Sequence, residues 1–244
     1  MVRTFMCHPF LEPKAFTDQY DPTTLCCMHS DRVVIGSTLG AIHIHNLLKG
    51  TCPPIHHFAT VGIPLVINYS ERGGFILSLE AKRNDYKVDS KIGSVPCQVN
   101  VYYNFMNSNE PQASLHAGYT TAVATSALAN YVNQFVSINL PANANVTDIA
   151  ICNINANIAV AMDTKVSIFA LKENECHTPQ QKGNLIDFLP ILEVESVFKV
   201  WSVSLSLNFV GLASKTELRV EQLFVSIPED EKICQAEDVS QLLE

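Results

Sequence analysis

The chain has 244 residues, which is enough to bury a sizeable core, and its formal net charge is −8, with 47% hydrophobic and 16% charged residues. The acidic balance without a basic stripe argues against nucleic-acid binding, and no apolar run approaches the roughly 20 residues that a transmembrane helix needs. The first residues lack the apolar stretch of a signal peptide, so we expect a cytosolic protein whose eight cysteines are buried thiols.

The chain divides into units of short apolar runs separated by turn residues, a pattern that predicts antiparallel β-meanders. The strands predicted for the first unit are residues 24–28, 33–36, 41–47 and 55–59. Pro53 and Pro54 precede the last of these strands. Because proline is tolerated in a sheet mainly at its edge, we expect that strand on the outside.

The second unit begins near residue 65 and carries long insertions. Its predicted strands are residues 65–69, 75–79 and 98–105, with residues 113–119 as an outer strand. Gly73 and Gly74 offer the positive φ that a tight hairpin between the first two strands requires. Residues 82–96 form a polar insertion, residues 120–133 fit either a short helix or an irregular insertion, and residues 134–140 are strand-like again.

The third unit has the clearest pattern. Its predicted strands are residues 148–152, 158–162 and 166–171, followed by residues 185–195 as a connector or outer strand. The first two strands are apolar at successive positions, so both of their faces should be covered by protein. The strands of the fourth unit are residues 200–207, 209–213 and 217–223, and the acidic tail at residues 228–244 is expected to fray.

The units recur with a similar apolar face. Corresponding apolar positions of the third strand are Ile42 and Ile44, Val166 and Ile168, and Leu218 and Val220. The first two units begin about 40 residues apart, as propeller blades do, while the next interval is twice as long and holds two blades or one with insertions. We therefore predict an all-β fold over residues 1–227, a divergent WD40-like β-propeller that is partial and has about four to five blades.

The histidines are the main candidates for a metal site. His43 and His45 occupy alternate positions of one predicted strand, and His56 and His57 belong to the next one. Imidazoles bind zinc, but no carboxylate or cysteine stands at ligand spacing, so an exposed polar strand face is the favoured interpretation. A histidine-rich metal-binding or enzymatic β domain is the alternative function, and a secreted adhesion module is a third possibility that the missing signal sequence opposes.

The chain shows no established catalytic motif. Cys26 and Cys27 near His29 suggest a thiolate with a base, yet both cysteines fall in an apolar strand, where a thiol is usually inert. The sequence has no nucleophile-elbow, zinc-protease or phosphate-loop motif. We predict a protein without enzymatic activity, catalytic residues, bound metal or cofactor.

One short segment resembles a clathrin-box peptide, in which leucine, an aliphatic residue, any residue, an aromatic or aliphatic residue and an acid follow one another. The segment consists of Leu185, Ile186, Asp187, Phe188 and Leu189. Such a peptide binds in an extended form, with alternate side chains in apolar pockets of the partner. Leu189 stands where the pattern has an acid, and an outer strand packed on its own blade is the favoured interpretation.

Several features in a fixed order carry a family resemblance. They are His8-Pro9-Phe10, residues 58–62, Tyr69-Ser70-Glu71 before residues 75–82, Leu140-Pro141, residues 157–172 and residues 185–188. In this order and spacing they resemble the N-terminal region of the Hermansky-Pudlak syndrome 3 protein family, in which a helical solenoid follows the propeller-like region. Relative to that family, residues 82–96 and 120–133 look like insertions.

The resemblance implies a function without catalysis. Members of the family are subunits of biogenesis of lysosome-related organelles complex two, a cytosolic assembly that is recruited to endosomal membranes and directs cargo to pigment granules. The implied partners are the other subunits of that complex. The family's clathrin-box segment maps onto residues 185–189, which implies clathrin as a further partner, although Leu189 removes the charged contact.

Overall fold

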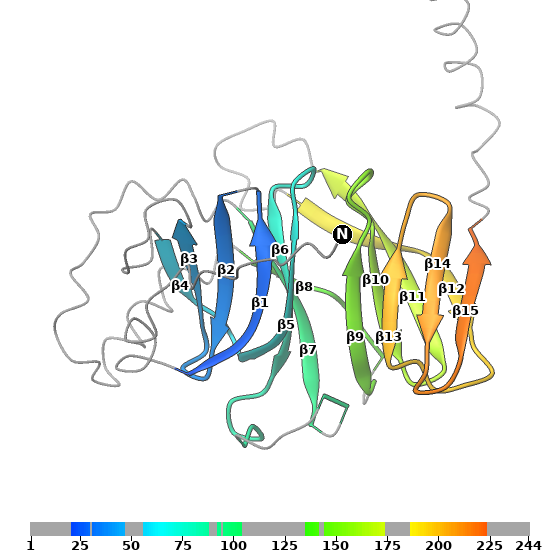
Figure 1. The fold of residues 1–244 in the computed structure, drawn as a ribbon, viewed down its shortest axis with the longest axis horizontal. Coiled ribbons are helices and arrows are strands. Elements are labelled where there is room, and N and C mark those ends of the chain that lie inside the picture. The colour runs from blue at the N-terminus through cyan, green and yellow to red at the C-terminus, as the bar shows by residue number, and fades with distance from the viewer. Residues whose placement is uncertain are drawn as a thin grey trace, which may run out of the picture.

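The computed structural model describes residues 21–29, 31–46, 56–87, 92–93, 95–103, 135–141, 144–173 and 186–223. Within these ranges, the chain forms fifteen strands that make four antiparallel sheets (Figure 1). The sheets stand side by side in chain order, from the blue first sheet to the orange fourth one. In the described ranges there is no helix long and apolar enough to cross a membrane.

Each predicted unit is one sheet. The first sheet, in spatial order, consists of β1 (Pro22–Met28), β2 (Arg32–Ser37), β3 (Ala41–Asn46) and β4 (His56–Ala59). The second consists of β5 (Ile63–Ser70), β6 (Phe75–Ala81), β7 (Cys97–Tyr103) and β8 (Phe135–Ser137). The third has the order β12 (Ile186–Glu195), β11 (Lys165–Glu173), β10 (Ile158–Met162) and β9 (Val146–Ile151). The fourth consists of β13 (Ser202–Leu205), β14 (Phe209–Ala213) and β15 (Leu218–Gln222).

The first strands of the four units form a row along one side of the stack. Strand β5 contacts β1 and β9, and β9 contacts β13 in turn. The later strands of each sheet lie progressively farther from this row, because neighbouring strands pair in sequence order within every sheet. This radial arrangement is that of propeller blades.

Apolar clusters between adjacent sheets hold the stack together. Between the first and second sheets the buried side chains are Met28, Val34, Ile42, Ile44, Phe58, Ile67, Ile76 and Tyr102. A second cluster joins the second and third sheets, and a third joins the third and fourth sheets. Because β6 and β10 lie inside their sheets and between two neighbouring sheets, every one of their residues is buried, as the successive apolar positions of β10 predict. Each fully buried Val, Leu, Ile or Phe contributes roughly 1.5–3 kcal/mol to folding.

Among the described residues, β8 is the outermost strand of the second sheet, and the outer strand predicted at residues 113–119 lies outside them. The described residues between the start of the second unit and the start of the third form one blade, β5–β8. One expectation requires correction. In the fourth sheet the apolar positions recur, but Leu218 is 75% and Val220 61% exposed, because no other sheet of the described part of the chain packs on that face. The end of the predicted domain at residue 227 and the acidic tail at residues 228–244 also lie outside the described residues.

Candidate interaction surfaces

The clathrin-box-like segment forms the start of β12, the outermost strand of the third sheet, and Leu185 lies outside the described residues. Phe188 is only 7% exposed, and its ring makes an edge-to-face contact with Phe75 at a centroid distance of 5.4 Å. Ile186 packs against the same cluster, while Asp187 is exposed and Leu189 is 46% exposed. A partner pocket can receive the Phe188 ring only if this part of β12 leaves the sheet, so clathrin binding stays a prediction.

The histidine face of the first sheet is buried, not exposed as the sequence suggested. His43 pairs with His57 across β3 and β4, and their rings stack with centroids 6.2 Å apart. His43 and His45 are almost fully buried. Burial, together with the neighbouring His57 and His45, lowers the pKa of His43 to about 3, so this imidazole is neutral at physiological pH. Among the described residues, no group of three or more His, Cys, Asp or Glu side chains is arranged to hold a metal ion.

The two adjacent cysteines of β1 have different environments. Cys26 is partly buried, and burial, with a smaller effect of Cys27, raises the pKa of its thiol to about 12. Cys27 is exposed, contrary to the expectation that the thiols are buried. The nearby His29 contacts the Glu71 carboxylate at 3.3 Å and the Tyr69 hydroxyl at 3.1 Å. Its ring nitrogens are therefore engaged with neighbours other than the cysteines.

A buried carboxylate that sequence analysis missed lies at the junction of the first two sheets. One oxygen of Glu80 accepts hydrogen bonds from the Gly62 backbone N–H and the Asn100 side chain, both at 2.8 Å. Its other oxygen accepts the Tyr102 hydroxyl at 2.8 Å, and the Tyr102 oxygen accepts the Val61 N–H at 3.0 Å. Since these partners are groups of the chain itself, the arrangement fixes the linker between β4 and β5.

Arg83 completes this junction from the solvent side. Its guanidinium donates hydrogen bonds to the carbonyls of Leu39, Gly40, Thr60 and Val61, at 2.8 to 3.1 Å. Two of these carbonyls belong to the β2–β3 turn and two to the β4–β5 linker. Arg83, which follows β6, thus joins two connections of the first sheet to the second sheet.

An open groove of about 330 Å³ lies between β5, β9 and β13, in the row of first strands. Asp148 of β9 accepts hydrogen bonds from the Ser202 hydroxyl at 2.8 Å and from the Val203 N–H at 2.9 Å, so it joins the third sheet to the fourth. The Asn68 amide donates to the Ile149 carbonyl at 2.9 Å and joins the second sheet to the third. The Asp148 carboxylate therefore connects two blades.

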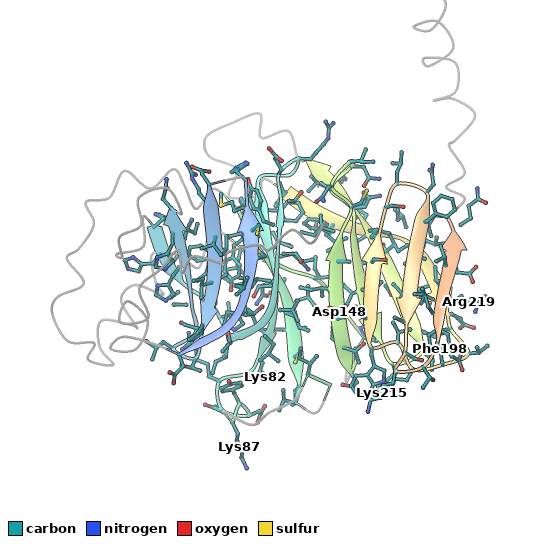
Figure 2. All side chains as sticks on the ribbon, in the orientation of Figure 1. Lys82, Lys87, Asp148, Phe198, Lys215 and Arg219 are labelled. Atoms are coloured by element: carbon teal, nitrogen blue, oxygen red, sulfur yellow. The ribbon has the colours of Figure 1, made fainter. Side chains whose placement is uncertain are left out.

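The only tryptophan of the chain forms an exposed patch at one end of the fourth sheet. Trp201 is 41% exposed, and the ammonium groups of Lys199 and Lys215 lie 5.2 and 5.1 Å from its ring centroid. Lys199 also forms an ion pair with Asp163 at 3.0 Å. We call these four residues the Trp201 patch; Lys215 lies on the lower edge of the view in Figure 2. A signal for this patch was the predicted pairing of β13 with β14, because the β13–β14 hairpin brings residue 215 close to residue 201.

Comparisons with known proteins agree on fold and family. The sequence model described as Hermansky-Pudlak syndrome 3 protein, N-terminal, matches residues 3–242. BLOC-2 complex member HPS3 of Mus musculus is 20% identical over 230 residues, which cover 91% of this chain and 21% of that protein. This chain therefore spans about a fifth of the length of that curated relative.

Two solved structures are similar in fold. The β-propeller domain of Cps50 (Swd1) from Myceliophteria thermophila gives a TM-score of 0.51 at 10% identity, over 84% of this chain and 55% of that one. The computationally designed Ika4 protein gives a TM-score of 0.50 at 12% identity, over 90% of this chain and 100% of that one. Together with the four antiparallel sheets, these similarities confirm the predicted all-β, propeller-like fold.

Proposed function

Because this chain belongs to the Hermansky-Pudlak syndrome 3 protein family, whose N-terminal model covers residues 3–242, we propose that it is a non-catalytic protein-interaction subunit. Its mouse relative is named a BLOC-2 complex member. The proposed partners are accordingly the other subunits of biogenesis of lysosome-related organelles complex two. In this proposal the protein acts in the cytoplasm, at the surface of endosomal membranes, in trafficking to lysosome-related organelles such as pigment granules.

The family match over nearly the whole chain is the observation that carries this proposal. The fold supports it because a stack of four sheets, joined by three apolar clusters, is a rigid support for exposed loops and edges. Propeller folds present such surfaces without forming or breaking bonds. The proposed mechanism is therefore steric: the blades hold contact residues in a fixed arrangement for partner subunits.

The Trp201 patch is the proposed contact surface. Tryptophan is enriched among residues that dominate binding energy at protein interfaces, because a large flat ring buries much area at little entropic cost. The flanking Lys199 and Lys215 ammonium groups lie within cation–π distance of the ring and add positive charge to an otherwise acidic protein. A partner surface with an apolar pocket and an acidic rim fits this patch.

Co-purification tests the function and the contact surface separately. The chain is co-expressed with the remaining subunits of the complex, and the subunits retained on the tagged chain are measured. Trp201→Ala is expected to reduce retention, and Leu207→Ala, another exposed apolar side chain near the same sheet, serves as the matched control. If the unaltered chain retains no subunit, the proposed function is wrong. If the Trp201 and Leu207 variants behave alike, the function stands but the contact lies elsewhere.

A further inference from the structure

Among the residues that the structure describes, no strand pairs with the outer edge of β15. Within the described ranges the other three sheets have four strands each, whereas the fourth sheet ends at β15. Leu223 donates its N–H to the Asn208 carbonyl, and Ser214 donates to the Glu217 carbonyl, so odd-numbered residues of this strand face β14. Strand backbone groups alternate in direction. The N–H and C=O groups of Leu218, Val220 and Gln222 therefore point away from the sheet, toward the open edge.

This edge is also apolar on one face. Leu218 and Val220 are strongly exposed, and Phe209 beside them on β14 is exposed as well. An exposed, apolar edge strand is a template for pairing with another strand. In Figure 2, Arg219 marks this edge at the right-hand end of the molecule, where no other strand of the described chain intervenes.

The sequence of β15 is complementary in charge to itself. When two copies of the strand run antiparallel with Val220 opposite Val220, Arg219 of each copy faces Glu221 of the other. Because Val220 directs its backbone outward, the two Val220 residues form the hydrogen-bonded pair, and the Arg219–Glu221 pairs fall at non-hydrogen-bonded positions. At those positions opposing side chains are closest, with Cα atoms about 4.5 Å apart. We propose that β15 pairs with β15 of a second copy of this chain, to form a two-fold symmetric dimer.

The side chains on the edge are arranged for this pairing. Arg219 and Glu221 lie on the same face of β15, both partly accessible, and already form an ion pair within the strand. Two copies would thus bring two arginines and two glutamates into one alternating network. On the opposite face, each Val220 packs beside the other, and Leu218 lies opposite Gln222. A two-fold dimer closes on itself, because the outer edge of β15 is then paired in both copies.

Charge reversal gives a reciprocal test with the whole 244-residue chain. Sedimentation velocity over a range of protein concentrations is expected to show a dimer. Arg219→Glu alone, or Glu221→Arg alone, places like charges opposite each other twice, so the dissociation constant should rise by roughly tenfold or more. An equimolar mixture of the two variants should form a heterodimer, because each Glu then faces an Arg again. The double variant should regain the homodimer.

A backbone variant tests the pairing without changing charge. Val220→Pro removes an outward N–H that does not bond to β14, so it should abolish the dimer while circular dichroism shows retained β structure. Val220→Thr, which keeps the N–H, is the matched control and should still dimerise. A chain that is monomeric at all concentrations overturns the proposal. That result is expected if another segment of this chain or a partner subunit covers the edge of β15. A dimer that is indifferent to these charges and to proline, or a mixture without heterodimer, also overturns it.

Discussion

The carboxylate of Glu80 lies 2.8 Å from the backbone nitrogen of Gly62, so an acid of the second sheet holds the linker that arrives from the first. Glu80→Ala leaves the Gly62 N–H and the Asn100 amide without this acceptor in a buried site. We predict a loss of about 2–4 kcal/mol in the free energy of unfolding, measured by urea denaturation. Glu80→Gln keeps an acceptor oxygen and should lose less. Equal losses in the two variants would contradict the role of the hydrogen bonds.

The same carboxylate predicts a pH dependence of stability. Desolvation raises the pKa of Glu80 above its ordinary value of 4.5, against the opposing effect of the hydrogen bonds from Gly62, Tyr102 and Asn100. The folded state therefore keeps the proton at pH values where the unfolded chain has lost it. The stability contribution of this group is fully present below pH 4.5 and is lost as the pH rises through the raised value in the folded state.

Glu80→Gln removes this titration and so isolates it. Across the window above pH 4.5, the unfolding free energy of the unaltered chain should fall relative to that of the glutamine variant. Urea denaturation of both proteins at a series of pH values gives the difference directly. A difference that does not change with pH, or that moves in favour of the unaltered chain as the pH rises, is the contrary result.

Arg83 provides a prediction for the solvent side of the junction. Its guanidinium bonds four backbone carbonyls, and a lysine ammonium has only three donors on a flexible stem. We expect Arg83→Ala to lower the free energy of unfolding by about 1–2 kcal/mol, and Arg83→Lys to recover only part of it. The adjacent, exposed Lys82 is the control, and Lys82→Ala should change stability by less than about 0.5 kcal/mol. If Arg83→Lys is as stable as the unaltered chain, the planar arrangement of donors in the guanidinium does not contribute to stability.

The sequence predicted the strands well because short apolar runs and turn residues are local signals. Gly74 has the positive φ expected for the β5–β6 hairpin. The turn before β10 contains Asn153, Asn155 and Asn157, and asparagine tolerates a positive φ, but the positive φ in this turn belongs to Ala156. Ala156 is fully buried in the cluster between the second and third sheets, so packing between sheets overrides the local preference of asparagine.

Contacts between sheets could not be predicted from the sequence, because the residues in contact are far apart along the chain. Glu80 lies near the end of β6, where a carboxylate is usually solvated, and nothing local shows that Tyr102 and Gly62 will enclose it. Likewise, Leu218 repeats the apolar position of Ile42, yet within the described part of the chain a neighbouring sheet covers Ile42 and none covers Leu218. Periodicity identifies an apolar face but not whether another sheet packs on that face.

The two cysteines of β1 should differ in reactivity. With a thiol pKa of about 12, Cys26 is almost entirely protonated near neutral pH, and the thiolate is the nucleophile. We predict that iodoacetamide modifies the exposed Cys27 in the folded chain and leaves Cys26 unmodified. Mass spectrometry of the peptide, with Cys27→Ser as control, assigns the site. Modification of Cys26 in the folded Cys27→Ser variant would show that β1 opens.

The last prediction concerns the clathrin-box-like segment. As an outer strand the segment needs Phe188 buried, whereas as a clathrin ligand it needs Phe188 accessible. As a core residue, Phe188 contacts Phe75, and Phe188→Ala should cost about 3–5 kcal/mol of unfolding free energy. Leu189→Asp changes a half-exposed side chain, restores the acid of the box pattern, and should cost less than about 1 kcal/mol. A pull-down with the clathrin terminal domain separates the roles. Stronger retention of the Leu189→Asp chain, and loss of retention in Phe188→Ala, would establish a ligand that leaves the sheet edge. Retention that neither substitution changes would mean that the segment serves only as the outer strand of its blade.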